Sequence, residues 1–195
     1  MTTEKKYIYF FGSGKADGTG TMKDALGGKG AGLAEMTNAG VPVPPGFTII
    51  TEVCNLFYDL GKRVPDGLDA EMREYMTKVE DSVGSFRFGD ADKPLLLSVR
   101  SGSKFSMPGI MDTVLNLGLN DQTVLGLGER TKNDRFAWDC YRRLLTMFGN
   151  VVLGIDRKAF EALLDQAKAR IGVKTDPEVA AEALRDLAGQ YKTLI

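Results

Sequence analysis

One segment in the middle of the chain combines residue types that could bind an anion. Arg100 follows a short apolar run, residues 95–99, which begins after a proline and is typical of a strand buried on both faces. The next residues are small or cationic, and they leave backbone N–H groups open to an anion: Ser101, Gly102, Ser103, Lys104, Ser106 and Gly109. A second β-like run follows at residues 113–119. The pattern predicts a phosphate-binding loop between two buried strands; the alternative is a surface loop whose arginine pairs with a nearby carboxylate.

A second glycine-rich segment, GGKGAGLAEM at residues 27–36, could complete such a site. Gly27 and Gly28 stand where a helix would begin, and glycines there let a ligand approach the backbone closely. Lys29 would lie in the first turn, where the helix dipole disfavours a cation, so its place makes sense if it meets a bound phosphate. The spacing matches neither the G-x-G-x-x-G nor the Walker pattern. A solvated lysine on a glycine-weakened helix is the alternative.

The elements expected to position these segments form an α+β arrangement. Residues 7–11 and 47–50 are rich in aromatic and β-branched types and predict strands. Two apolar stripes at helical spacing follow, and both are expected to face the core. Thr51 is expected to cap the first of these two helices.

Strand signals nearly vanish after Asn120, and amphipathic helices take their place. Asn133 or Asp134 is expected to cap one helix and Asp156 the next. Residues 175–178 hold a cap residue, a first-turn proline and an acid, and are expected to open the last helix.

This change in composition predicts two parts. Residues 1–120 are expected to form an incomplete α/β lobe, and residues 121–195 a helical subdomain. The last helix has no glycine or proline stop signal before Ile195, which predicts that the natural chain continues.

Composition limits the classes of function. Of the 195 residues 43% are hydrophobic and 26% charged, as in soluble globular proteins. The net charge of -1 and the pI of about 5.6 provide no general attraction to nucleic acid or anionic lipid, so an anion site must be local. No apolar run is long enough to span a bilayer, and the N-terminal residues lack signal-peptide features. The expected location is the cytoplasm, without nucleic-acid or membrane partners.

The chain has no histidine, which excludes Ser-His-Asp and Cys-His catalysis, imidazole zinc sites and a phosphohistidine within these residues. Cys54 and Cys140 have apolar neighbours on expected helices, and we interpret both as reduced core residues.

The two glycine-rich segments together resemble the N-terminal nucleotide-binding region of the pyruvate, phosphate dikinase family. The likeness is carried by GGKGAGLAEM at residues 27–36 and by SVRSGSKFSMPGIMDTVLNLGLN at residues 98–120. VPVPPGFTIIT at residues 41–51 and RFAWDCYRRLLTMFGNVV at residues 135–152 extend it over nearly the whole chain. Phosphoenolpyruvate synthases share a GGKG segment and a VRS triplet, but typically have an acidic loop after the arginine.

The resemblance implies an ATP-grasp-like fold, of which this chain would be the first α/β lobe with an inserted helical subdomain. In the family, this region binds MgATP and passes its β-phosphate to a histidine on a separate domain, which serves a pyruvate-binding barrel. The overall reaction converts ATP, phosphate and pyruvate to AMP, pyrophosphate and phosphoenolpyruvate. Implied partners are the remaining ATP-grasp lobe, the phosphohistidine and pyruvate-binding domains, and a second subunit in a homodimer.

The resemblance also assigns site residues. Lys29 and Arg100 are the implied catalytic residues, and the implied nucleotide contacts are Lys29, Arg100, Ser101, Gly109, Ile110 and Met111. Ligands for Mg²⁺ are expected outside this chain. Where the family has Ala-Arg-Ala, this chain has Ser103-Lys104-Phe105, which leaves the role of Lys104 open. Two alternatives remain: a phosphoenolpyruvate synthase-like region, or a non-catalytic interaction module with a vestigial phosphate loop.

Overall fold

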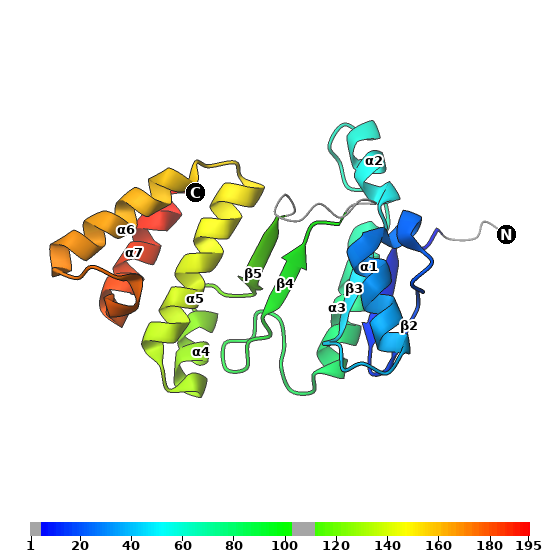
Figure 1. Cartoon of the computed structure of the whole chain (residues 1–195), viewed down its shortest axis with the longest axis horizontal. Helices are drawn as coiled ribbons and strands as arrows, with labels where there is room; N and C mark the ends of the chain where they lie inside the picture. The colour runs from blue at the N-terminus through cyan, green and yellow to red at the C-terminus, as the bar shows by residue number, and fades with distance from the viewer. Residues whose placement is uncertain (1–4, 103–111) are drawn as a thin grey trace. The chain divides into compact units, whose positions relative to one another are not determined.

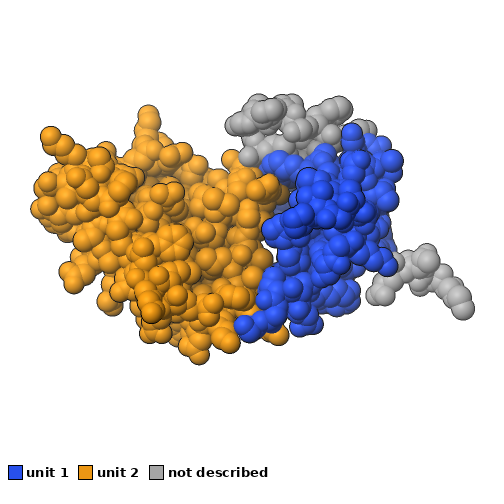
Figure 2. All heavy atoms as spheres, turned by 60° about the horizontal axis from the view of Figure 1, so that its bottom comes forward, with its two compact units in different colours: residues 1–85, 101–111 blue, residues 86–100, 112–195 orange. Residues whose placement is uncertain are grey.

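The computed structural model describes residues 5–102 and 112–195, and its helices and strands confirm the expected α+β class (Figure 1). The chain divides into two compact units (Figure 2). The first holds the residues up to Ser85 together with Ser101 and Gly102, and the second holds Phe86–Arg100 and Asp112–Ile195.

The first unit is built on a three-stranded antiparallel sheet of order β2-β1-β3. The strands are β1 (Ile8–Gly12), β2 (Lys15–Ala16) and β3 (Gly46–Ile49), so both expected strands are confirmed. The helices are α1 (Lys23–Asn38), α2 (Glu52–Asp59) and α3 (Leu68–Ser82). One cluster packs around α1 with Leu26, Ala31 and Ala34, and a second joins Ile8 to α3. Neighbouring residues of β1 contribute to different clusters, as expected for a strand covered on both faces.

The second unit packs helices against a two-stranded antiparallel sheet, β4 (Leu97–Arg100) and β5 (Thr113–Leu117). The helices are α4 (Thr123–Thr131), α5 (Asp134–Met147), the π-turn Phe148–Val152, α6 (Arg157–Ile171), the 3-10 turn Asp176–Glu178 and α7 (Ala181–Leu194). Phe160 and Tyr191 are fully buried at its centre, and their ring centroids lie 5.0 Å apart, edge to face. The Tyr191 hydroxyl donates to the Phe160 carbonyl at 2.8 Å.

Contrary to the prediction from the sequence, strands β4 and β5 are not buried on both faces. Val114 is buried among the helices, whereas Val99 is 49% exposed. Because Val114 and Leu119 belong to one apolar cluster with α5 and α7, the compact units separate elsewhere than at residue 120. A lobe formed by residues 1–120 stays a prediction.

Two of the expected helix caps are confirmed. The side chain of Asn133 accepts from the Phe136 N–H at 2.9 Å, and the side chain of Asp156 accepts from the Lys158 N–H at 3.0 Å. Residues 175–178 do not open α7. They form a separate 3-10 turn with its own capping box, after which the chain is extended and α7 begins at Ala181.

Two expectations about the core are confirmed only in part. Helix α2 has no fully buried residue, because its apolar stripe is only partly covered within the described part of the chain. Cys54 lies on that helix and is exposed, while Cys140 is partly buried and keeps a raised thiol pKa because of burial. No helix among the described residues is long and apolar enough to cross a membrane.

Candidate functional site

Helix α1 is interrupted at the glycine pair that the sequence singled out. Gly27 has φ 68° and ψ 170°, a backbone conformation essentially limited to glycine. The helix begins earlier than expected, at Lys23, and resumes after Gly27. Residues 28–30 therefore form a new first turn, and the N–H groups of a first helical turn generally have no partner within the helix and lie at the positive end of its dipole. We call residues 27–30 the Lys29 turn.

One side of the Lys29 turn packs closely against the sheet and the other is open. A Cβ atom added to Gly30 would lie 2.6 Å from Cγ2 of Thr48 on β3, so only glycine allows this approach without a shift. A Cβ atom added to Gly28 would meet no heavy atom within 4 Å in the part of the chain that the structure describes. Among the described residues, the turn is thus packed against β3 at Gly30 and open on the Cβ side of Gly28.

Lys29 joins the two glycine-rich segments. Its Nζ donates to the carbonyl oxygen of Ser101 at 3.2 Å, although the two residues are 72 positions apart in the chain. Lysine has three donors, so this bond leaves others for an anion. The predicted pairing of Lys29 with the segment that follows Arg100 is therefore present in the first unit.

The structure places one of the other predicted residues in the second unit and does not describe four more of them. Arg100 is the last residue of β4, is exposed and belongs to the second compact unit. Gly109, Ile110, Met111 and Lys104 lie outside the described residues. The structure thus brings together two of the predicted nucleotide contacts, Lys29 and Ser101.

The residues of the Lys29 turn suit the phosphate groups of a nucleotide, since glycine N–H groups and a lysine ammonium are anion-binding groups. For Mg²⁺ the fit is different. Across residues 5–102 and 112–195 there is no group of three or more His, Cys, Asp or Glu side chains that could hold a metal ion. The Lys29 turn itself contains one lysine ammonium and backbone N–H groups, and no Asp, Glu, His or Cys.

The sequence did not reveal the hydrogen bonds that Thr51 makes next to this turn. It does not cap α2 with its side chain, as expected; its Oγ1 donates to the Asp24 carbonyl at 2.6 Å and its N–H to the Ala25 carbonyl at 2.8 Å. Both acceptors lie in the short turn before Gly27. A cap at a helix start is a local pattern, whereas these bonds join Thr51 to residues 27 and 26 positions away, and no signal in the sequence indicates them.

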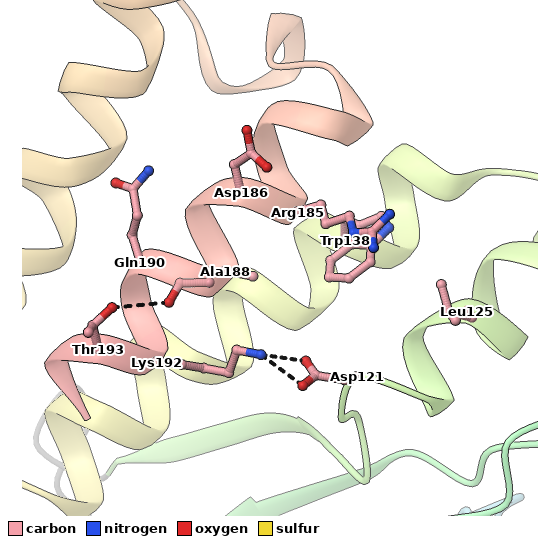
Figure 3. Close-up of a pocket in the computed structure, with 10 residues that line it drawn as sticks. Asp121, Leu125, Trp138, Arg185, Asp186, Ala188, Gln190, Lys192 and Thr193 are labelled. Carbon is pink, nitrogen blue, oxygen red and sulfur yellow. Dashed lines mark hydrogen bonds and ion pairs between the residues drawn. The ribbon is translucent and has the colours of Figure 1, made fainter.

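The second unit carries a surface pocket of its own, with a volume of about 670 Å³. Figure 3 shows its charged groups, among them Lys192, which contacts both carboxylate oxygens of Asp121 at 2.7 and 2.8 Å. The guanidinium of Arg185 lies 5.8 Å from the ring centre of Trp138. Two acidic and two basic side chains line this pocket, and none of them is a predicted site residue.

The family comparison places the Lys29 turn in a known kind of domain. Residues 23–85 match the family model described as "Pyruvate phosphate dikinase, AMP/ATP-binding domain". This range contains the whole of α1, β3 and α3, and therefore both Lys29 and Thr51.

Curated relatives extend the match to nearly the whole chain. The chain is 51% identical over 190 residues to a pyruvate, phosphate dikinase of Rhizobium meliloti (strain 1021), covering 97% of this chain and 21% of that protein. It is 52% identical to pyruvate, phosphate dikinase 1, chloroplastic, of Zea mays, covering 98% of this chain and 20% of that one. The expected resemblance is thus confirmed, and the chain spans about a fifth of the length of the relatives it matches.

Proposed function

We propose that this chain is the part of a pyruvate, phosphate dikinase that helps to bind MgATP. In the complete enzyme, the β-phosphate of ATP would pass to a histidine on another domain, and the overall reaction would yield AMP, pyrophosphate and phosphoenolpyruvate. The single observation that carries the proposal is the contact of Lys29 with Ser101, at a glycine turn inside the matched range.

The chemistry of the site residues supports this function. Phosphoryl transfer depends mostly on positioning the phosphates and on stabilising charge on their oxygens. The N–H groups after Gly27 and the ammonium of Lys29 supply fixed and movable positive charge. Arg100 would add a planar fork for two oxygens. Bound Mg²⁺ would further neutralise the phosphate oxygens.

The finer architecture is part of the same proposal. An ATP-grasp-like fold, with the helical residues 121–195 as an inserted subdomain, agrees with the mixed helix and strand content. The length of the relatives supports partners within a longer polypeptide: a second lobe, a phosphohistidine domain and a pyruvate-binding domain. A homodimer and a cytoplasmic location are further proposals, which sedimentation and cell fractionation would test.

The proposal is tested in the complete polypeptide that carries these residues. With Lys29→Ala or Arg100→Ala, we expect AMP formation from ATP to fall about a hundredfold or more, as for the loss of one charged group that stabilises a transition state. Lys23→Ala is the matched control, because Lys23 is exposed on the same helix. Unchanged AMP formation in Lys29→Ala would contradict the proposal.

A further inference from the structure

Thr51 uses its hydroxyl in an unusual way for a threonine at the start of a helix. A threonine in this position commonly accepts a bond from the helix it precedes, which stabilises the helix by about 1 kcal/mol. Thr51 has helical φ and ψ of −59° and −31°, and its side chain makes no such bond. Its Oγ1 instead donates to Asp24 of another helix at 2.6 Å.

Both bonds of Thr51 end on the turn that precedes the break in α1. The N–H of Thr51 donates to Ala25, only two residues before Gly27. Because Gly27 has non-helical φ and ψ, the regular hydrogen-bond ladder does not by itself fix the direction in which the helix resumes. External contacts must therefore help to set that direction.

The strand β3 and its end provide these contacts on both sides of the break. Before Gly27, Thr51 holds the carbonyls of Asp24 and Ala25. After Gly27, Thr48 lies directly beneath Gly30, with no room for a side chain between them. Lys29 lies between these two attachment points, so its direction depends on both.

We propose that Thr51 is a positioning residue for the Lys29 turn: its hydroxyl fixes the turn that directs the Lys29 ammonium and the N–H groups of residues 28–30 toward the phosphates of ATP. Thr51 does not itself touch the nucleotide. The inference rests on the proposed function and adds a residue that acts through Lys29.

The test uses three variants of the complete polypeptide. Thr51→Val removes the hydroxyl and keeps the shape, and it should raise the KM for ATP roughly three- to tenfold, the effect of losing one hydrogen bond. Turnover at saturating ATP should stay within about twofold, because the loss concerns binding. Thr51→Ser keeps the hydroxyl and should have a KM within about twofold of the unmodified enzyme. If Thr51→Val does not fold, Thr51→Ala serves as a second variant without a hydroxyl.

Thr37→Val is the matched control on the same helix. The buried Thr37 also donates through Oγ1 to a carbonyl, that of Leu33 at 2.8 Å, but it lies far along α1 from the break. It should lower the stability of the fold and leave the KM for ATP unchanged. An equal rise in KM for Thr37→Val and Thr51→Val would overturn the positioning role, as would Thr51→Ser behaving like Thr51→Val.

A double variant separates the inference from the function on which it rests. If Thr51 acts through Lys29, the effect of Thr51→Val on ATP binding should shrink when Lys29→Ala is already present. Fully additive effects would overturn the inference, and so would a normal KM in Thr51→Val beside a raised KM in Lys29→Ala. Unchanged AMP formation together with a normal KM in Lys29→Ala itself would overturn the proposed function instead.

Discussion

The Lys29 ammonium lies 3.2 Å from the Ser101 carbonyl oxygen, and this bond connects the two glycine-rich segments of the chain. The lysine reaches Ser101 from a helix turn that is fixed by Gly27, by the close approach of Gly30 to Thr48 and by the two bonds of Thr51. The groups that we propose to bind the phosphates are thus arranged by backbone geometry around Lys29.

Two adjacent glycines of the Lys29 turn should respond differently to alanine. Gly27→Ala should lower the free energy of unfolding by about 1–3 kcal/mol, because φ 68° and ψ 170° are strained for a residue with Cβ. Gly28→Ala should change it by less than about 0.5 kcal/mol, since its Cβ would enter open space among the described residues. It should nevertheless weaken ATP binding. Urea unfolding and nucleotide titration check both, and equal stability of the two variants would contradict the assigned backbone geometry.

The contact between α1 and β3 should tolerate no side chain at residue 30. Gly30→Ala should cost about 1–3 kcal/mol of stability, because the new Cβ would overlap the Thr48 side chain. Adding Thr48→Ala removes the overlapping atoms and should recover part of that loss. The double-mutant cycle by chemical denaturation measures this coupling; strictly additive losses would show that the two residues do not meet.

Two neighbouring arginines on α5 should differ sharply in their effect on stability. The buried Arg142 donates through Nε and Nη2 to one Asp139 oxygen at 2.9 and 2.7 Å, whereas the side chain of Arg143 is 61% exposed. Burial lowers the pKa of Arg142, but the bond and charge of Asp139 outweigh this and raise it. Arg142→Met should cost about 3 kcal/mol, because the poorly exposed Asp139 would be left with the bond from the exposed Arg143 at 2.9 Å, and Arg143→Met should cost less than about 1 kcal/mol. Similar unfolding midpoints for the two variants would refute this difference.

The ion pair of Asp121 and Lys192 should add a small pH-dependent stability. The hydrogen bond from Lys192 Nζ lowers the pKa of Asp121 below its ordinary value of 3.8. A lowered pKa in the folded state means that the contribution is complete above that ordinary value and is lost as the pH falls through the folded pKa. Because both side chains are exposed, Asp121→Asn should cost at most about 1 kcal/mol near pH 7, and this cost should decline as the pH falls through the folded pKa of Asp121. A cost that does not decline in acid would assign the effect to packing rather than charge.

Local sequence patterns were sufficient for much of the fold. The strands near residues 7–11 and 47–50 and the caps Asn133 and Asp156 follow from patterns within a few residues, and all are confirmed. Patterns over larger distances were less informative. Val99 is 49% exposed although its cross-strand partner Val114 is buried, and an apolar run does not indicate how much of each strand will be covered.

At the candidate site, too, local features could be predicted from the sequence and long-range contacts could not. The glycines and Lys29 could be singled out because their types and spacing are those of an anion-binding turn. The role of Thr51 could not, because its hydroxyl bonds to a carbonyl of a different helix and the residue is equally suited to an N-cap. The bond from Lys29 to Ser101 depends on how the chain folds between them.

The central claim is that Lys29 holds the phosphates of ATP during transfer of the β-phosphate. The most direct measurement is the labelling of the complete polypeptide with ATP that carries radioactive phosphorus at the β position, in the absence of pyruvate. The unmodified protein and Lys23→Ala should acquire label, whereas Lys29→Ala should acquire little at the same ATP concentration. Labelling of Lys29→Ala at the rate and to the extent of the unmodified protein would contradict the account.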